Sequence, residues 1–268
     1  MTFGGEDSPV TNLSSLLRVA LGLLVVALGV IVFMVVCTLL LPWRSARIRA
    51  CNVFGHIVGR AVLWVSGARV APGLRAQIDP TFPAIYVSNH TSPTDIFLGI
   101  WLAPLGTCGV AKKEVIWYPF FGQLYAISGH LRVDRANREN AVEAMRSTAE
   151  VVKAHRLGIW IWPEGTRSKD GRLLQFKKGF AHLALATRLP IVPVVVTGAH
   201  HNWKKNTLQI EATDIGVQIL PPISTLDWTA ERLDEHVAQV REQFLRHLPA
   251  DQLPAAVEAP RVAAAGRR

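Results

Sequence analysis

The longest hydrophobic run of the chain lies near its N-terminus. Residues 19–41 are 23 consecutive positions without a charge. At about 1.5 Å per residue, a helix of that length reaches across a bilayer core of ~30 Å. The run is longer than the core of a signal peptide, and it ends in the interface-like sequence Leu41-Pro42-Trp43-Arg44. The pattern therefore predicts a retained membrane helix, which either crosses the bilayer or folds back within it.

A second apolar stretch, residues 53–65, is interrupted by His56 and Arg60, which share one helical face. This pattern is typical of an amphipathic helix that lies at a membrane surface. Residues 42–75 carry six arginines and no acidic residue, and positive residues stay on the cytoplasmic side of a membrane. We therefore predict a membrane-anchoring segment at residues 1–71, with this helix pair in the inner (cytoplasmic) membrane and the rest of the chain facing the cytosol.

Beyond residue 71, short apolar runs alternate with longer stretches of helical periodicity. This alternation is typical of an α/β fold with a central, largely parallel sheet flanked by helices, which we predict for residues 72–247. Pro193 inside an apolar run indicates an edge strand or a bulge. The Ala/Pro-rich residues 248–268 are predicted to be a disordered end. The predicted strands are 82–88, 107–111, 131–133, 158–162 and 191–197, and the predicted helices are 93–103, 119–128, 138–155, 179–188 and 229–247.

Composition and missing motifs narrow the function classes. Half of the residues are hydrophobic and the net charge is +9, so the chain can bury a core and is suited to an anionic partner. Nucleic acid fits this charge but not the membrane run, so we predict no nucleic-acid partner. The sequence contains no GxxxxGK[ST], GxGxxG or GxSxG motif, which disfavours a nucleotide site and a hydrolase serine.

The metal-binding residue types are also sparse along the chain. Three scattered cysteines, Cys37, Cys51 and Cys108, form neither a disulfide framework nor a CxxC site, and HExxH is absent. The pair His200–His201 has no third ligand nearby in the sequence. We therefore predict no metal and no cofactor.

The first candidate site is the sequence Asn89-His90-Thr91-Ser92-Pro93-Thr94-Asp95, which leaves a predicted strand and enters a predicted helix. With Ser92 as the N-cap, Asp95 lies in the first helical turn and can meet His90. A carboxylate on one ring nitrogen leaves the other nitrogen to accept a proton, so this histidine could act as a general base. The Ser-x-x-Asp spacing is also that of a capping box, so a purely structural role stays open.

The second candidate site is the sequence Trp162-Pro163-Glu164-Gly165-Thr166-Arg167-Ser168, directly after another predicted strand. The guanidinium of Arg167 suits a phosphate group, and Gly165 lets the backbone approach a ligand. Glu164 either accepts a hydrogen bond from a substrate hydroxyl or orients Arg167. A polar turn without function is the alternative. Two further cations, Lys112 and Arg135, also come at the ends of predicted strands, where α/β folds place ligands.

Taken together, these motifs resemble the 1-acyl-sn-glycerol-3-phosphate (lysophosphatidate) acyltransferase family, bacterial type. The blocks NHxxxxD, AKKE followed by VDR, PEGTRS and IVPV occur in the family's order across roughly residues 85–197. The resemblance implies an acyltransferase-type α/β fold with an N-terminal membrane helix pair. It also implies transfer of a fatty acyl group from acyl-CoA or acyl carrier protein, as donor substrate, to the sn-2 hydroxyl of lysophosphatidate, giving phosphatidate.

The resemblance also implies roles for single residues. His90 would be the base and Asp95 its orienting partner, while Lys112, Arg135 and Arg167 would surround the acceptor phosphate. Glu164, Gly165 and Thr166 would shape the acceptor site. Three alternatives stay open at this point: another lysolipid as acceptor, glycerol 3-phosphate as acceptor, and a non-catalytic tether that binds anionic lipid. Acyl-chain length, the choice of donor and the oligomeric state are not predicted.

Overall fold

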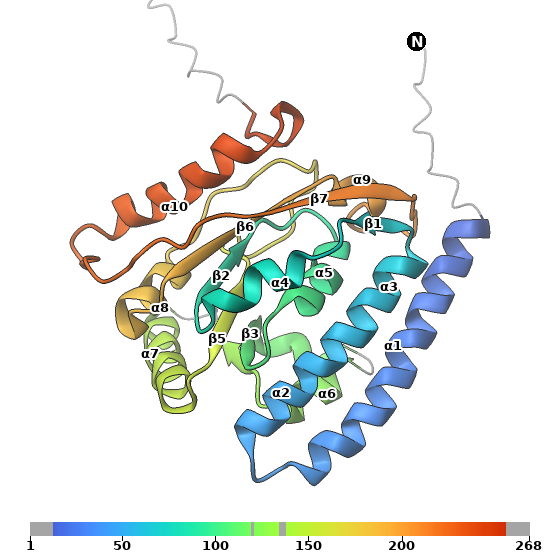
Figure 1. The fold of residues 1–268 in the computed structure, drawn as a ribbon, viewed down its shortest axis with the longest axis horizontal. Helices are drawn as coiled ribbons and strands as arrows, with labels where there is room; N and C mark the ends of the chain where they lie inside the picture. The colour runs from blue at the N-terminus through green and yellow to red at the C-terminus, as the bar shows by residue number, and fades with distance from the viewer. Residues whose placement is uncertain (1–12, 119–120, 134–137, 256–268) are drawn as a thin grey trace, which may run out of the picture.

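A seven-stranded sheet in the order β1-β7-β6-β2-β5-β3-β4 forms the centre of the molecule, with helices on both faces (Figure 1). The computed structural model describes residues 13–118, 121–133 and 138–255. Neighbouring strands are parallel except for β6 and β7, which confirms the predicted α/β class with a largely parallel sheet. The strands are β1 (Ala68–Val70), β2 (Ile85–Ser88), β3 (Thr107–Lys112), β4 (Leu131–Val133), β5 (Gly158–Ile161), β6 (Ile191–Thr197) and β7 (Thr213–Ile219).

The central strands β2, β5 and β6 are apolar along most of their length because both faces of the sheet are covered. Alternate residues enter two hydrophobic cores: Ile85 and Val87 face one, and Tyr86 faces the other. The first core packs against α7 (Arg138–His155), α8 (Gly179–Thr187) and α10 (Leu233–His247), and the second packs against α4 (Leu74–Ile78) and α5 (Thr94–Leu102). Shorter elements are η2 (Asp79–Thr81), η3 (Lys113–Trp117), α6 (Phe121–Ile127), α9 (Ala199–Asn202) and η4 (Ala250–Gln252).

Two long helical stretches form the N-terminal part. The apolar helix α1 (Leu13–Leu39) runs beside a second stretch made of α2 (Arg44–Phe54), the π-helical turn η1 (Gly55–Gly59) and α3 (Arg60–Val65) (Figure 1). By length and composition α1 could cross a membrane, and 11% of its most apolar window is buried inside the protein. The predicted amphipathic helix 53–65 is thus the second half of a longer stretch that begins at Arg44.

Close backbone packing joins this second stretch to α5. A Cβ at Gly55 would lie 2.5 Å from the carbonyl oxygen of Ile100, and one at Gly59 would lie 2.6 Å from that of Phe97. Only glycine therefore fits at these two positions, which are one helical turn apart. The side chain of Asn52 adds two hydrogen bonds to the main chain at the start of β3. The N-terminal helices are thereby packed against the α/β body.

Three features differ from the sequence-based predictions. Strands β1 and β7 were not predicted, because β1 is three residues long and β7 alternates with polar residues that face outward. The edge prediction for Pro193 is wrong, since β6 lies between β2 and β7; regular pairing with β7, however, begins only at Val194.

The third difference concerns the C-terminal end of the α/β body. Residues 248–255 are described, and Leu248 and Gln252 are buried, so the predicted disordered end is wrong for this part. Residues 256–268 lie outside the described residues.

Candidate active site

The two candidate loops leave neighbouring parallel strands at the same edge of the sheet. Strand β2 leads into the His90 loop, β5 leads into the Glu164 loop, and Val87 pairs with Ile161 between them. Asn89 fixes the first loop to β6, because its side-chain amide donates to the carbonyl of Val196 and accepts from the same residue's N–H, each at 2.8 Å. The sheet therefore brings together residues that are more than seventy positions apart in the sequence.

The predicted pairing of His90 with Asp95 is present. His90 Nδ1 lies 3.1 Å from Asp95 Oδ2, and both side chains are nearly excluded from solvent. When Nδ1 donates to this carboxylate, Nε2 carries the lone pair that can accept a proton. The geometry is therefore that of a general base with an orienting carboxylate.

Asp95 also performs the capping role that was the alternative reading of its motif. Its Oδ2 accepts from the main-chain N–H groups of Thr91 (2.6 Å) and Ser92 (2.7 Å), and Ser92 Oγ accepts from Thr94 N–H. Asp95 Oδ1 is buried and has no hydrogen-bond partner within the described part of the chain. The same carboxylate thus shapes the loop and contacts the histidine, so the capping bonds and the predicted pairing are present together.

We expect Asp95→Asn to lower kcat by about 10²-fold, because an amide does not hold the Nδ1–H tautomer as a carboxylate does. The loss should be smaller than for His90→Ala. Steady-state kinetics of the single variants and of the double variant check this role. A double variant no slower than His90→Ala indicates that the two residues act as one unit, whereas additive losses would contradict the pairing.

The second loop holds His90 from three directions. The main-chain N–H of His90 donates to Glu164 Oε1 at 2.6 Å, and its carbonyl accepts from the N–H of Ser168 at 2.9 Å. The imidazole ring stacks on Trp162, with ring centroids 4.8 Å apart. These contacts fix both the backbone and the ring plane of the histidine before any substrate binds.

The contacts of Glu164 therefore differ from those expected of a residue that binds the acceptor substrate. Its second carboxylate oxygen, Oε2, accepts from the N–H of Leu174 at 2.8 Å, so both oxygens bind the main chain and the side chain is 2% exposed. Burial raises the pKa of this carboxyl to about 7, although the two N–H donors oppose the shift. Glu164 neither orients Arg167 nor faces a substrate hydroxyl in this geometry, and its observed contacts brace the His90 loop.

We expect this carboxyl to make the stability of the protein depend on pH. Because its pKa rises from 4.5 to about 7 on folding, its contribution to stability is present below pH 4.5 and is lost as the pH rises through 7. The pKa difference corresponds to ~3 kcal/mol. Glu164→Gln does not titrate, so the difference in thermal unfolding between the parent protein and this variant should change between pH 5 and pH 8. Parallel pH profiles would contradict the assignment.

The structure describes only some of the other residues that were predicted to bind the acceptor substrate and its phosphate. Gly165 has a φ of +71°, and the side chain of Lys177 lies against it. Thr166 is exposed and Arg167 is half-buried; in the described part of the chain, no hydrogen bond or ion pair engages the Arg167 guanidinium. Lys112 ends β3 at the same edge of the sheet, but its side chain is outside what the structure describes.

The predicted phosphate ligand Arg135 lies outside the described residues. A lysine that was not predicted stands beside the same loop, because Lys205 Nζ donates to the carbonyl of Arg167 at 2.6 Å. Arg167, Lys177 and Lys205 therefore concentrate positive charge around the loop that follows β5, which makes this side of the histidine suited to an anion.

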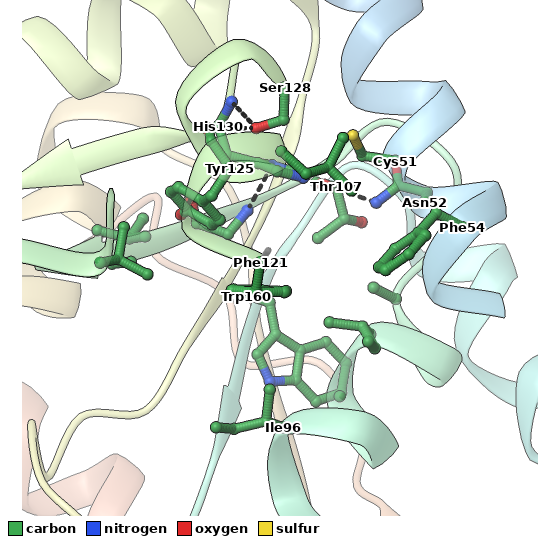
Figure 2. Close-up of a pocket in the computed structure, with 18 of the residues that line it drawn as sticks. Cys51, Asn52, Phe54, Ile96, Thr107, Phe121, Tyr125, Ser128, His130 and Trp160 are labelled. Carbon is green, nitrogen blue, oxygen red and sulfur yellow. Dashed lines mark hydrogen bonds between the residues drawn. The ribbon is translucent and has the colours of Figure 1, made fainter. Parts of the chain in front are cut away.

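His90 and Trp162 are among the residues that line an apolar cavity of about 200 Å³. It runs between α2, α5, α6 and β3, and Figure 2 shows Ile96 and Trp160 toward one end of it and Ser128 and His130 toward the other. The lining is almost entirely apolar. The site thus joins a histidine–aspartate pair, a cationic loop and a narrow hydrophobic space.

Comparisons with known proteins identify the family. Residues 74–197 match the family model described as Acyltransferase. A 1-acyl-sn-glycerol-3-phosphate acyltransferase from Limnanthes douglasii is 45% identical over 249 residues, which cover 93% of this chain and 88% of the relative. The chain belongs to the 1-acyl-sn-glycerol-3-phosphate acyltransferase family. The protein of the same name from Escherichia coli (strain K12) is 34% identical over 198 residues, covering 73% of this chain and 80% of the relative.

The fold of this acyltransferase agrees with a solved structure. The crystal structure of the 1-acyl-sn-glycerophosphate (LPA) acyltransferase PlsC from Thermotoga maritima has a TM-score of 0.62 at 24% identity, covering 85% of this chain and 95% of that one. The likeness confirms the predicted acyltransferase-type fold. Membership of an enzyme family also rules out the non-catalytic tether.

Sequence reasoning missed two groups that shape this acyltransferase site. The stacking of Trp162 on His90 was not predicted, although its position directly after β5 was a usable signal. Tyr125 and His130, at the far part of the cavity, carried no signal: the tyrosine hydroxyl donates to the carbonyls of Gly109 and Leu131, and His130 Nδ1 accepts from Gly109 N–H. Burial lowers the pKa of His130 to about 4, so its ring is neutral and suits an apolar space.

Proposed function

We propose that the chain transfers a fatty acyl group from an acyl thioester, acyl-CoA or acyl carrier protein, to the sn-2 hydroxyl of 1-acyl-glycerol 3-phosphate, giving phosphatidate. The observation that carries this proposal is the His90–Asp95 pair, whose histidine lines an apolar cavity and lies beside the cationic Arg167 loop. The names of the relatives support the same acceptor.

In the proposed reaction, Nε2 of His90 removes the proton of the acceptor hydroxyl as its oxygen attacks the thioester carbon. The new ester C–O bond forms through a tetrahedral intermediate, the C–S bond breaks, and the thiolate leaves with a proton from the imidazolium. Asp95 holds the ring orientation and stabilises its charge during transfer. No acyl-enzyme is required, because neither a serine nor a cysteine is hydrogen-bonded to Nε2 among the described residues.

The cavity is the proposed site of the acyl chain of the donor. Its apolar lining offers a chain the same surroundings as a protein core, and water that occupies it is released on binding. Because His90 is part of the lining, a chain inserted there would bring its thioester to the base. Proximity of this kind supplies a large part of an enzymatic rate.

The guanidinium of Arg167 is the proposed main contact of the acceptor phosphate. It is half-buried and has no side-chain partner in the described part of the chain, so it can present its planar fork to phosphate oxygens. Lys112 and Arg135 are proposed as further phosphate ligands, and Gly165 and Thr166 as the wall of the acceptor site. Glu164 is proposed to support this wall indirectly, through the loop it braces.

The N-terminal helices are proposed to bind the cytosolic face of the cytoplasmic membrane, with α1 embedded in one leaflet. The two ends of α1 have different partners: Ser15 Oγ accepts from and donates to the main chain of Ile210, and Cys37 Sγ lies 3.5 Å from Cys51 Sγ of α2. Because the first of these contacts ties the start of α1 to the α/β body, we favour a helix that lies within one leaflet over one that crosses a ~30 Å core. Its outward face is apolar, and Trp64 and Trp117 are exposed nearby as interface residues.

We expect cysteines introduced at the start of α1 and in α2 beyond its other end, as Ser14→Cys and Arg49→Cys, to react with a membrane-impermeant thiol reagent from the same side of sealed vesicles. The three native cysteines are buried, so background labelling should be low. Inside-out and right-side-out vesicles provide the matched comparison. Labelling of the two positions from opposite sides would contradict an in-plane α1.

An acceptor panel tests the proposed substrate. Purified enzyme is given labelled acyl-CoA or acyl carrier protein with lysophosphatidate, glycerol 3-phosphate or lysophosphatidylcholine. We expect the highest kcat/KM with lysophosphatidate, because it alone combines a terminal phosphate for Arg167 with a lipid chain that stays at the membrane. A preference for either other acceptor would overturn the substrate assignment while leaving the acyltransferase class intact.

A further inference from the structure

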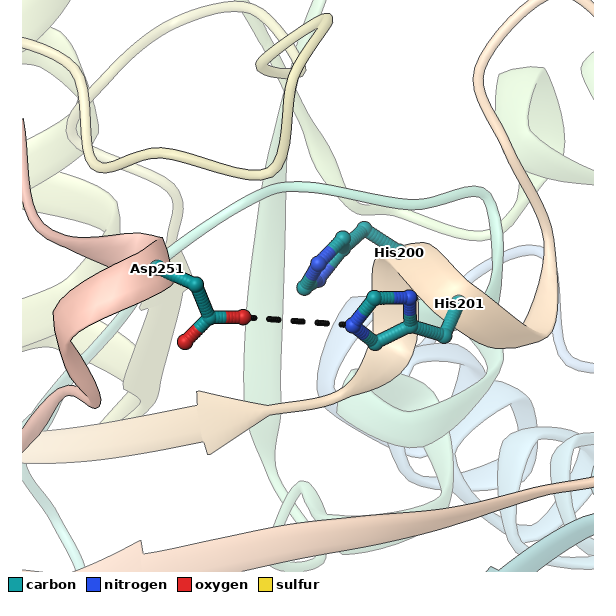
Figure 3. A group of neighbouring side chains, drawn as sticks. All are labelled: His200, His201 and Asp251. Carbon is teal, nitrogen blue, oxygen red and sulfur yellow. Dashed lines mark ion pairs between the residues drawn. The ribbon is translucent and has the colours of Figure 1, made fainter. Parts of the chain in front are cut away.

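A cluster of three side chains with metal-ligand chemistry lies at the end of β6. His200, His201 and Asp251 each place a ligand atom within 4.8 Å of the others (Figure 3). His201 Nε2 is 3.9 Å from Asp251 Oδ2, and the two imidazole rings lie 3.8 Å apart. The third ligand, which the sequence around the two histidines does not supply, comes from the C-terminal segment.

One ring nitrogen of His200 lacks a hydrogen-bond partner in the described part of the protein. This nitrogen, Nδ1, is buried, a condition that is costly for a polar atom without a partner.

Backbone hydrogen bonds hold both halves of the cluster in place. Gln252, next to Asp251, accepts from the N–H of Gly198 through its side chain, and its carbonyl accepts from the N–H of Leu173. Gly171 packs against the His200 ring, because a Cβ there would lie 2.5 Å from Cδ2 of that ring. The cluster therefore joins the C-terminal segment, the β6–α9 turn and the loop that follows Arg167.

We propose that His200, His201 and Asp251 bind one divalent first-row transition-metal ion, with Zn²⁺ the best fit, and that water completes its coordination. Two imidazoles and one carboxylate are a common ligand set for such ions. Zinc–ligand bonds of about 2.0–2.2 Å in a tetrahedral site place ligand atoms roughly 3.3 Å apart. The ligand atoms must therefore move slightly closer together, and rotations of the exposed His201 and Asp251 side chains can achieve this.

The test uses the full-length protein in detergent, stripped with EDTA, and Zn²⁺ alone as the probe. Competition with a chromophoric chelator gives the stoichiometry and affinity, and Co²⁺ substitution reports tetrahedral ligation by its visible absorption. We expect one ion per chain and a rise in Tm of several degrees at saturating Zn²⁺. Asp251→Asn and His201→Ala should each weaken binding at least about tenfold and reduce the rise in Tm at the same Zn²⁺ concentration.

The matched control is His247→Ala, which removes an exposed histidine at the end of α10 and should bind Zn²⁺ like the parent protein. Both ligand variants change exposed side chains, so their folding should be preserved, and their Tm without metal verifies this. Equal Zn²⁺ affinity in the parent protein, Asp251→Asn and His201→Ala would overturn the proposal, as would the absence of binding to the parent protein.

Discussion

His90→Ala should lower kcat for acyl transfer by at least about 10³-fold while leaving the KM of both substrates nearly unchanged. General-base catalysis by a positioned side chain typically contributes 10²–10⁴-fold, and the stacked, carboxylate-oriented ring of His90 is pre-positioned for it. The KM values should persist because a base acts on the transition state more than on the bound substrates. Steady-state kinetics on purified enzyme measures both quantities.

The fold should tolerate this change, since the main-chain bonds of His90 to Glu164 and Ser168 do not need the imidazole. Thermal unfolding of the variant verifies that point. His247→Ala, an exposed histidine on α10, is the matched control and should keep full activity. Turnover of His90→Ala close to that of the parent protein would refute the assignment of the base.

The second large effect is expected for Arg167→Ala, which should raise the KM of lysophosphatidate by 10- to 100-fold. A hydrogen bond to a charged group contributes about 1.5–3 kcal/mol, and the guanidinium is the side chain that best fits a phosphate in this loop. The KM of the acyl donor should stay constant, because the donor chain is assigned to the apolar cavity on the other side of His90.

Lys169→Ala is the matched control for Arg167→Ala. It removes the same charge from an exposed position two residues further along the loop, so a purely long-range electrostatic effect would raise KM equally in both variants. We expect the control to change the KM of lysophosphatidate less than twofold. A rise in the donor KM alone after Arg167→Ala would show that this arginine serves the thioester substrate instead.

The positions of the two candidate loops were predictable because they depend on one rule of parallel sheets. His90 follows β2 and Glu164 follows β5, and the carboxyl ends of parallel strands meet at one edge. The boundaries of β4, β6 and α7 were predicted as observed, since each coincides with a clear change of periodicity. Local pattern was therefore sufficient for the five strands other than β1 and β7 and for the location of the site.

The partners within the site were not predictable in the same way. Glu164 bonds the main chain of His90, 74 residues away, and a main-chain N–H carries no sequence signal. Strand β7 was missed because only one of its faces is buried, and its partner β1 is too short to show alternation. Such features depend on which segments meet in space, and a single sequence does not encode that locally.

The C-terminal segment shows most clearly how tertiary contacts can order a segment whose composition predicts disorder. An Ala/Pro-rich composition favours disorder, yet Gln252 is buried and bonds Gly198, so the segment docks beside β6. This docking also brings Asp251 to the two histidines. A short segment can thus be ordered by a few specific hydrogen bonds that its composition does not reveal.

The most direct test of the central claim is the position of the acyl group in the product. Purified enzyme is incubated with 1-acyl-glycerol 3-phosphate and a labelled acyl thioester, and the phosphatidate formed is digested with a phospholipase specific for the sn-2 ester. The account predicts that the label enters phosphatidate, that the digestion releases it from sn-2, and that His90→Ala forms almost none. Label found only in free fatty acid, or equal phosphatidate from His90→Ala, would contradict it.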